Sequence, residues 1–335
     1  MTTKVLVTAP FPSDLIDKLN SVSRQVEIEQ QTLPKEGWPD DKTTSCEVYY
    51  AIGAVPPPEL APNLRWVQGH WAGVNHLHDQ PIWDSDIHIT SASGIHAPGT
   101  GQYVMAQMLA WANHVPDWLA QQEKGEWPSD RWKKFLPKEL RGRTVGILGY
   151  GSIGREVARL AKGFGMTVLA TKRDARNVID NGYTVSGSGD PKGELADRIY
   201  PGEATRSMVA DCDYVVITLP LTSTTRHLVD ENVLREMKPE CVLINVGRGP
   251  IVQEEHLVRA LKKGWIAGAG LDVFETEPLP VDSPLWSLDN VILSPHISGF
   301  TEHYDDRVTD LFAENIRRYL AGEPLLNLVN RQAGY

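Results

Sequence analysis

The sequence predicts an α/β protein of two Rossmann-like domains, the larger of which is built on a doubly wound parallel sheet. Its 335 residues are more than one ordinary hydrophobic core accommodates, so two domains are expected. Short apolar runs alternate with stretches of helical periodicity, which is the pattern of parallel sheets. Residues 143–173 read as strand, glycine turn, helix and strand, which is the βαβ unit of such a sheet.

The N-terminal part of the chain predicts the smaller domain. Its strand-like runs are KVLVTA, EVYYAI, LRWVQ and DIHIT, separated by polar or proline-rich turns such as Pro56 to Pro58. From about Thr100, apolar residues recur three and four positions apart in QYVMAQMLAWANHV. This spacing predicts a helix that leaves the first domain.

The larger domain continues after the βαβ unit with the strand-like runs DYVVITLP, CVLINVG, WIAGAGLDV and NVILSPH. Helical stretches such as EEHLVRALKKG separate them, so a parallel sheet is expected. Between them, Asn181 to Gly202 is rich in Gly, Asp and Pro and predicts a long surface loop.

A last helix is expected from Glu302 to Leu320. If it returns to the first domain, the chain crosses near Pro98 and Ser298, and a cleft with two hinges results. The expected domains are therefore 1–100 with 299–335, and 101–298.

Composition excludes several classes of protein. The formal net charge of −10 makes a nucleic-acid surface or an anionic membrane a poor match. The three cysteines, Cys46, Cys212 and Cys241, form no CxxC pair, which argues for a reducing compartment and against a disulfide or zinc framework. Neither a signal peptide nor an apolar run of membrane length is found, so a cytoplasmic protein is expected.

A glycine motif marks a dinucleotide site. Gly149, Gly151 and Gly154 form GxGxxG where a strand passes into a helix. The first glycine permits the tight turn, the second lets the backbone approach a pyrophosphate, and the third lets helix and strand pack closely. Free amides from about Ser152 and Ile153 would bind the diphosphate, assisted by the helix dipole.

The second strand of the βαβ unit ends on a basic pair, Lys172 and Arg173. A carboxylate commonly occupies this place and binds the adenosine ribose hydroxyls. A Lys-Arg pair would instead attract a 2′-phosphate, although two exposed cations at a strand end are the plainer alternative. The pair predicts that NADPH is preferred over NADH by about tenfold or more, with NAD as a possible second cofactor.

Three polar residues follow strands of the larger sheet. Arg248 lies in INVGRGP, Glu277 in LDVFETEPLP and His296 in ILSPHISG. Ligands of open α/β sheets bind beyond the carboxyl ends of the strands, so these side chains are expected to face the cofactor crevice. Each alone has an ordinary structural explanation, but their joint order favours a catalytic set.

The motifs WAGVN (71–75), GYGSIG, ITLPLTSTT, NVGRG, GLDVFETEP and SPHISG occur in this order. From about Leu64 to Leu320 the sequence resembles the D-isomer-specific 2-hydroxyacid dehydrogenase family, which includes glycerate, glyoxylate/hydroxypyruvate and phosphoglycerate dehydrogenases. The resemblance implies hydride transfer between a nicotinamide and C2 of a 2-oxo or 2-hydroxy acid. It also implies a flavodoxin-like substrate-binding domain and, with the apolar interdomain helix, a homodimer.

The chemistry of these residue types fits that reaction. Arg248 can bind the carboxylate and carbonyl of a 2-oxo acid with its planar fork, and the amides near Ala72 and Gly73 would hold the other side. His296 can protonate the nascent alkoxide, and Glu277 would hold the ring and favour its protonated form. We expect NADPH and the 2-oxo acid to bind, the domains to close, and hydride and proton transfer to follow.

The resemblance implies further contacts. Trp71 is expected at the substrate, and the expected cofactor neighbours are Thr100, Leu219, Pro220, Thr225, Val246, Gly247, Asp272, at the nicotinamide carboxamide, and His296 itself. The chain departs from the family at Gly101 and Gln102, where many members have Ala-Glu.

The sequence leaves alternatives to a 2-hydroxyacid dehydrogenase open. A formate dehydrogenase-like enzyme has Gln in place of the acid, so Glu277 argues against it. A nucleotide-sensing corepressor of the same fold would require a peptide-binding surface, which the sequence does not locate. His70, His76 and His78 could suggest a metal, but no further ligands at metal spacing accompany them.

Overall fold

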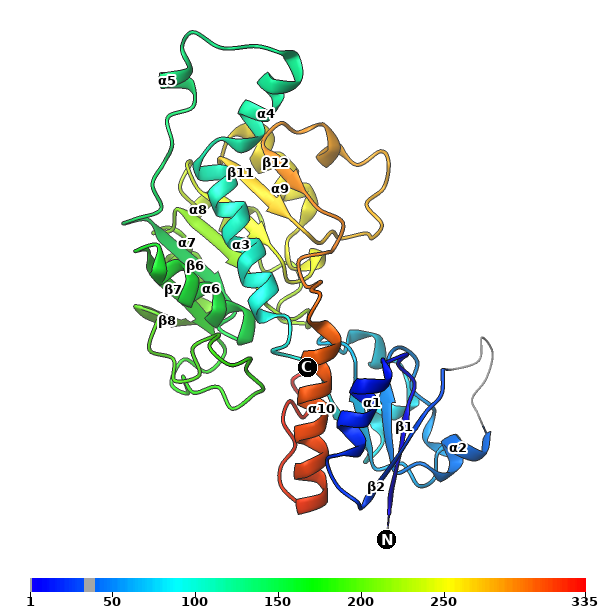
Figure 1. Ribbon diagram of the computed structural model, residues 1–335. Coiled ribbons are helices and arrows are strands. Elements are labelled where there is room, and N and C mark those ends of the chain that lie inside the picture. The colour runs from blue at the N-terminus through cyan, green and yellow to red at the C-terminus, as the bar shows by residue number, and fades with distance from the viewer. Residues whose placement is uncertain (1, 33–39) are drawn as a thin grey trace. The chain divides into compact units, whose positions relative to one another are not determined.

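The computed structural model describes residues 2–32 and 40–335 and divides into two compact units (Figure 1). Unit 1 consists of Met1–Ile95, Asn181–Val185 and Thr301–Tyr335, and unit 2 of His96–Asp180 and Ser186–Phe300. Asn181–Val185 belongs to unit 1, although the residues on both sides of it belong to unit 2. The chain therefore also passes between the units there, which the sequence did not predict.

Unit 1 contains a parallel sheet in the strand order β2-β1-β3-β4-β5. This is the flavodoxin-like order. The strands are β1 (Thr3–Val7), β2 (Val26–Gln30), β3 (Val48–Ala51), β4 (Trp66–Gly69) and β5 (His88–Thr90). Strand β2 was not predicted from the sequence, because its residues VEIEQ are mostly polar and an edge strand buries few of its side chains.

The helices of unit 1 are α1 (Ser13–Asn20), α2 (Asp40–Ser45) and α10 (Tyr304–Ala321). Helix α10 buries Val308, Leu311, Phe312 and Ile316, which share one face because the last three lie three, four and eight positions after Val308. The ring of Phe312 meets Trp66 of β4, so the C-terminal helix completes the core of the N-terminal sheet.

Unit 2 contains a parallel sheet in the order β12-β11-β10-β9-β6-β7-β8. The order reverses direction at β6, as in a doubly wound dinucleotide-binding sheet, and the two parallel sheets confirm the predicted fold class. The strands are β6 (Thr144–Leu148), β7 (Thr167–Lys172), β8 (Arg198–Pro201), β9 (Tyr214–Ile217), β10 (Val242–Asn245), β11 (Gly268–Leu271) and β12 (Val291–Leu293). The loop prediction for Asn181 to Gly202 is therefore wrong at its end, which forms the edge strand β8.

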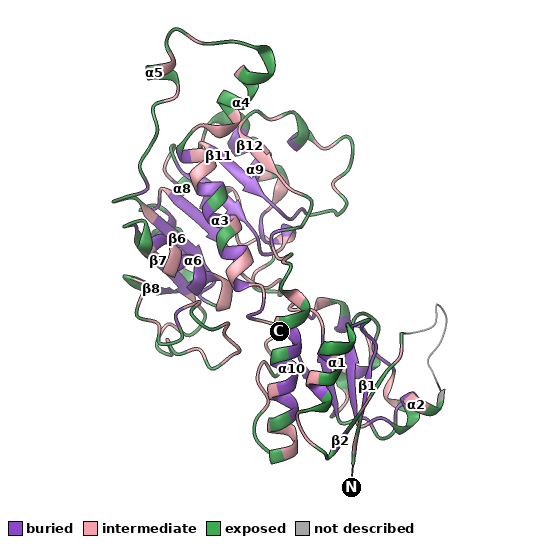
Figure 2. Cartoon of the chain, viewed as in Figure 1, coloured by how far each residue is buried: buried purple, intermediate pink, exposed green. Residues whose placement is uncertain are grey.

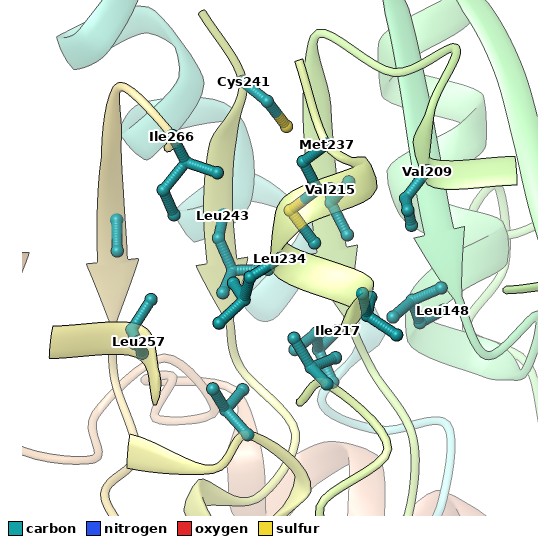
Figure 3. Packing of buried hydrophobic residues seen from close by; sticks show 14 of the residues in the cluster. Leu148, Val209, Val215, Ile217, Leu234, Met237, Cys241, Leu243, Leu257 and Ile266 are labelled. Atoms are coloured by element: carbon teal, nitrogen blue, oxygen red, sulfur yellow. The ribbon is translucent and has the colours of Figure 1, made fainter. Parts of the chain in front are cut away.

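Helices cover both faces of the larger sheet. They are α3 (Ala97–Ala112), α6 (Ser152–Gly163), α7 (Thr205–Val209), α8 (Glu231–Glu236) and α9 (Glu254–Lys263). Alternate residues of β9 point to opposite faces: Val215 packs with α7, α8 and α9, whereas Val216 packs with α3 and α6. Figure 3 shows the first of these cores, with Val215 and Leu243 of the sheet beside Leu234 of α8.

Between α3 and β6 an arm carries α4 (Val115–Lys124) and α5 (Arg131–Lys134) away from the sheet of unit 2 (Figure 1). Figure 2 shows that most of the arm is exposed. Its large apolar side chains at the surface are Trp118, Leu119, Trp127, Trp132 and Leu136. Across residues 2–32 and 40–335, no helix is both long enough and apolar enough to cross a membrane.

Candidate active site

The centre of the candidate site is a histidine–carboxylate pair in unit 2. His296 follows β12 and Glu277 follows β11, and His296 Nδ1 lies 2.7 Å from Glu277 Oε2. The other oxygen of Glu277 accepts a hydrogen bond from the backbone amide of Phe274 at 3.0 Å, which fixes the carboxylate. Because Nδ1 is engaged, Nε2 is the ring nitrogen left for proton transfer. Both side chains are partly exposed, at 48% and 36%, so a ligand can reach them.

The backbone of His296 is held by Asp272, at the end of β11. His296 has a positive φ of 53°, which is uncommon for a residue with a side chain. Its amide donates to the Asp272 carbonyl at 2.9 Å. The Asp272 carboxylate is fully buried and accepts from the amides of Ile297 and Ser298 at 2.8 and 2.9 Å and from Ser294 Oγ at 2.6 Å. The same carboxylate therefore organises the whole turn that carries His296.

Arg248 follows β10, the neighbour of β11 in the sheet. Asn245 fixes its loop, because Asn245 Oδ1 accepts from Gly247 N and Asn245 Nδ2 donates to Arg248 O. Burial lowers the pKa of the Arg248 guanidinium, and the nearby Glu277 carboxylate opposes that shift. The guanidinium stays charged, so a cation lies in the field of the histidine–carboxylate pair.

A close backbone approach brings the Arg248 and Glu277 loops together. A Cβ at Gly249 would lie 1.8 Å from the carbonyl oxygen of Phe274, a distance that no side chain tolerates. Gly249 is therefore required if the NVGRG loop is to lie against the LDVFETEP loop. The carboxyl ends of β10, β11 and β12 thus present Arg248, Glu277 and His296 along one edge of the sheet.

The glycine motif has the geometry of a diphosphate cradle. Gly149 takes a φ of 103°, and a Cβ at Gly154 would lie 2.2 Å from the Gly149 carbonyl oxygen. The space beside Gly151 is open, since nothing lies within 4 Å of where its Cβ would be. In the part of the chain that the structure describes, no side chain caps α6, which begins at Ser152, so the amides of Ser152 and Ile153 can bind an anion.

Among the remaining expected cofactor neighbours, Leu219 lies beside this cradle and Gly247 lies beside Leu219. Leu219 abuts it, because a Cβ at Gly149 would meet the Leu219 side chain at 3.0 Å. Thr225 Oγ1 donates to Pro220 O at 2.7 Å and shapes the loop after β9. Gly247 packs against Leu219 O, and Val246 is buried after β10. Thr100 is buried in the first turn of α3.

The basic pair lies at the end of β7. Lys172 is its last residue and is partly buried, whereas Arg173 is exposed. Burial lowers the pKa of Lys172, and the charge of Arg155 lowers it further, whereas Asp180 and Asp174 oppose the shift. A bound anion would favour the charged form of Lys172.

The chain is similar to known proteins both in sequence and in structure. The profile described as D-isomer specific 2-hydroxyacid dehydrogenase, NAD binding domain, matches residues 105–298. The glyoxylate reductase of Pyrococcus furiosus is 33% identical over 341 residues, which cover 99% of this chain and 96% of that protein.

The chain belongs to the D-isomer-specific 2-hydroxyacid dehydrogenase family. A family member from Xanthobacter autotrophicus, solved in complex with NADPH and MES, is 28% identical with a TM-score of 0.80 and full coverage of both chains, at 100% each. The NADPH-dependent glyoxylate/hydroxypyruvate reductase of Sinorhizobium meliloti, solved with NADP and sulfate, is 25% identical with a TM-score of 0.80 and the same coverage. This 2-hydroxyacid dehydrogenase is accordingly an NAD(P)-dependent oxidoreductase.

In the dehydrogenase's unit 1, Trp71, Ala72 and Gly73 follow β4 and are partly exposed. The Trp71 ring folds back over Gly69, where a Cβ would lie 2.4 Å from it, and meets His76 edge-on at 4.5 Å. His70 Nδ1 lies 2.7 Å from Tyr50 Oη. His78 Nε2 lies 3.2 Å from the carbonyl of Gly334. His70 and His78 thus each have a structural contact.

Several residues that hold the glycine turn and the Asp272 network were not predicted from the sequence. Thr218 Oγ1 donates to Gly149 O at 2.7 Å, and Thr171 Oγ1 accepts from Gly149 N at 3.2 Å. Tyr103 of α3 reaches Ser294 Oγ at 2.6 Å and so extends the Asp272 network. Thr218 lies inside the quoted run DYVVITLP, but only the fold reveals that its hydroxyl faces the glycine turn.

Proposed function

We propose that this protein reduces 2-oxo acids to 2-hydroxy acids with NADPH, and that glyoxylate and hydroxypyruvate are its first candidate substrates. The observation that carries the proposal is the His296–Glu277 pair, with Nδ1 and Oε2 2.7 Å apart, on strand ends next to that of Arg248. The names of the Pyrococcus and Sinorhizobium proteins support the substrate class.

In the proposed reaction, Arg248 binds the carboxylate and the adjacent carbonyl oxygen of the 2-oxo acid. When bound, the nicotinamide supplies a hydride to C2. His296 Nε2 delivers the proton that converts the developing alkoxide into a hydroxyl, and solvent then restores the ring proton. Glu277 keeps Nδ1 engaged, so that the ring neither rotates nor offers the wrong nitrogen. In the oxidative direction, His296 accepts the proton instead.

The proposed cofactor contacts follow from the cradle and its surroundings. The amides of Ser152 and Ile153 would hold the diphosphate, and Lys172 with Arg173 would hold a 2′-phosphate. Support comes from the position of Lys172 and Arg173 at the end of β7 and from the NADPH and NADP in the two solved relatives. The further proposed neighbours are Thr100, Gly149, Gly151, Gly154, Leu219, Pro220, Thr225, Val246, Gly247, Asp272 and His296.

Other parts of the assignment are also proposals. The backbone amides of Ala72 and Gly73 would bind the substrate carboxylate, and Trp71 would contact the substrate side chain. We propose a homodimer, because the arm of unit 2 exposes Trp127 at 83% and Trp132 at 76%, and tryptophan is enriched at protein–protein interfaces. The reduced, buried cysteines fit a cytoplasmic enzyme.

A substrate panel with both reduced cofactors tests the proposed function. The purified protein is mixed with NADPH or NADH and with glyoxylate, hydroxypyruvate, pyruvate, or aromatic and branched 2-oxo acids, and the absorbance of the reduced cofactor is followed. We expect turnover of glyoxylate or hydroxypyruvate, faster with NADPH. If NADPH binds but no 2-oxo acid is reduced, the nucleotide-sensing alternative replaces the enzyme. Sedimentation at micromolar concentration tests the dimer.

A further inference from the structure

Arg155 is a charged residue with almost no contact with water. It lies in α6 directly after Gly154, the third glycine of the cradle, and only 2% of its side chain is exposed. Burying a cation is costly unless it is paired and hydrogen-bonded. The neighbours that compensate Arg155 therefore indicate what the residue does.

The partners of Arg155 lie on both arms of one loop, residues 174–195, which we name the excursion loop. Nη2 donates to Val178 O at 2.6 Å, and Nε lies 3.4 Å from Asp180 Oδ2, both on the outgoing arm. Nη1 donates to Asp190 O at 2.5 Å, on the returning arm. The amide of Asp180 also donates to Pro191 O at 2.9 Å, which links the two arms directly. One guanidinium thus joins the two arms.

Residues in and next to the cradle also contact the excursion loop. Tyr150, between the first two glycines, donates its hydroxyl to Asp190 Oδ2 at 2.6 Å, and the Arg155 guanidinium lies over its ring at 4.7 Å. Glu156, next to Arg155, accepts from the amide of Gly189 at 2.6 Å. The loop is therefore anchored to the helix that begins at the diphosphate cradle.

This anchoring explains the departure from the family at Gly101. Glu156 is 2% exposed and is held by two hydrogen bonds from Arg159, at 2.6 and 2.8 Å. A Cβ at position 101 would lie 2.7 Å from Glu156 Cγ. Glycine in α3 thus makes room for the carboxylate that holds the excursion loop.

The excursion loop begins directly after the basic pair. Arg173 is followed at once by Asp174, and the first anchored residue, Val178, lies five positions beyond Arg173. The charge of Arg155 also lowers the pKa of Lys172, whereas Asp180 and Asp174 oppose that shift. Arg155 consequently affects the basic pair in two ways, by fixing the backbone that follows it and by adding positive charge behind it.

We propose that Arg155 is a positioning residue for recognition of the cofactor's 2′-phosphate, because it clamps both arms of the excursion loop and thereby places Lys172 and Arg173. This inference rests on the proposed preference for NADPH and adds a residue that does not itself touch the phosphate. A lysine at this position would keep the charge but could not bind two carbonyls and a carboxylate from one planar group.

The test compares adenosine 2′,5′-bisphosphate with adenosine 5′-monophosphate, which differ only in the 2′-phosphate. Calorimetry gives the affinity of each ligand for the full-length wild type, Arg155→Lys, Arg155→Met and the control Arg206→Met. Arg206 lies on α7 of the same unit, is exposed at 58%, and pairs with Glu236 at 2.6 Å. Because Arg155→Met can fail to fold, Arg155→Lys is the deciding variant.

We expect the wild type to bind the bisphosphate about tenfold more tightly than the monophosphate or better. Arg155→Lys should reduce that ratio about fivefold or more, with monophosphate binding nearly unchanged, and Arg206→Met should keep it. If Arg155→Lys folds and keeps the wild-type ratio, or weakens both ligands equally, Arg155 is only structural. If the wild type itself shows no preference, the proposed NADPH specificity fails and this inference fails with it.

Discussion

His296 Nδ1 lies 2.7 Å from Glu277 Oε2, although 19 positions separate the two residues in the sequence. They meet because they follow adjacent parallel strands, β12 and β11, whose carboxyl ends lie at one edge of the sheet. His296 can transfer a proton, and Glu277 fixes the orientation of the His296 ring. This arrangement makes each residue separately testable.

Replacing His296 by alanine should lower kcat about a hundredfold to ten-thousandfold, because the proposed general acid is lost. Cofactor affinity, measured by NADPH fluorescence, should change little. His303→Ala, at a histidine that is 58% exposed beside Glu302, is the matched control and should keep the wild-type rate. An unaltered rate in His296→Ala would remove that residue from the acid role.

Replacing Glu277 by glutamine should lower kcat about tenfold to a hundredfold, because the carboxylate oxygen that can accept from a protonated His296 is replaced by an NH2 donor. The amide oxygen can still accept from Phe274 N, so the loop should keep its place. A lower kcat in steady-state kinetics, together with unchanged thermal stability, would support this account. An equal loss of stability and rate would instead point to a structural role.

Replacing Arg248 by alanine should lower kcat/KM for the 2-oxo acid about tenfold to a hundredfold, because the bidentate contact with the substrate carboxylate is lost. NADPH affinity should be retained. Arg259→Ala, at a surface arginine that pairs with Glu231 at 2.8 Å, serves as the control. Normal kcat and KM in Arg248→Ala would refute the proposed placement of the substrate carboxylate.

Neutralising Lys172 and Arg173 together, as glutamines, should erode the preference for NADPH over NADH by about tenfold, measured as the ratio of the two kcat/KM values. The double variant of Lys262 and Lys263 removes the same charge from the exposed last turn of α9. That control separates a local phosphate contact from a change in overall charge. Equal ratios in the wild type and the Lys172/Arg173 variant would return the basic pair to an ordinary strand end.

Asp190 should contribute stability that depends on pH. Burial raises its pKa, but hydrogen bonds from Tyr150, Leu195 N and Glu194 N, with the charge of Arg155, outweigh burial and hold the pKa below its ordinary value. A carboxylate of this kind stabilises the fold above its unfolded-state pKa and ceases to do so as pH falls through the folded-state pKa. Asp190→Asn should therefore lower the free energy of unfolding at neutral pH, and the difference should shrink below about pH 4. Urea titrations across pH check this, and a difference independent of pH would contradict it.

The sequence alone determined the strands of the larger sheet other than β8, the glycine turn and the order of Arg248, Glu277 and His296. These features are local: apolar runs, one spacing of glycines and three polar residues at strand ends. It also predicted α10 within two residues at its start, Tyr304 against the expected Glu302. Polar edge strands such as β2 and β8 escaped, because a strand that buries few side chains carries little apolar periodicity.

Only the tertiary structure decided how distant polar groups meet. It showed that Asp272 binds the amides after His296, that Thr218 holds Gly149, and that Arg155 joins Val178 to Asp190. A buried polar group must find partners wherever the fold places them, so its role depends on the packing of elements and not on neighbouring residues. Local periodicity therefore determined which elements form, while the satisfaction of buried charges and hydrogen bonds determined how the site residues are held.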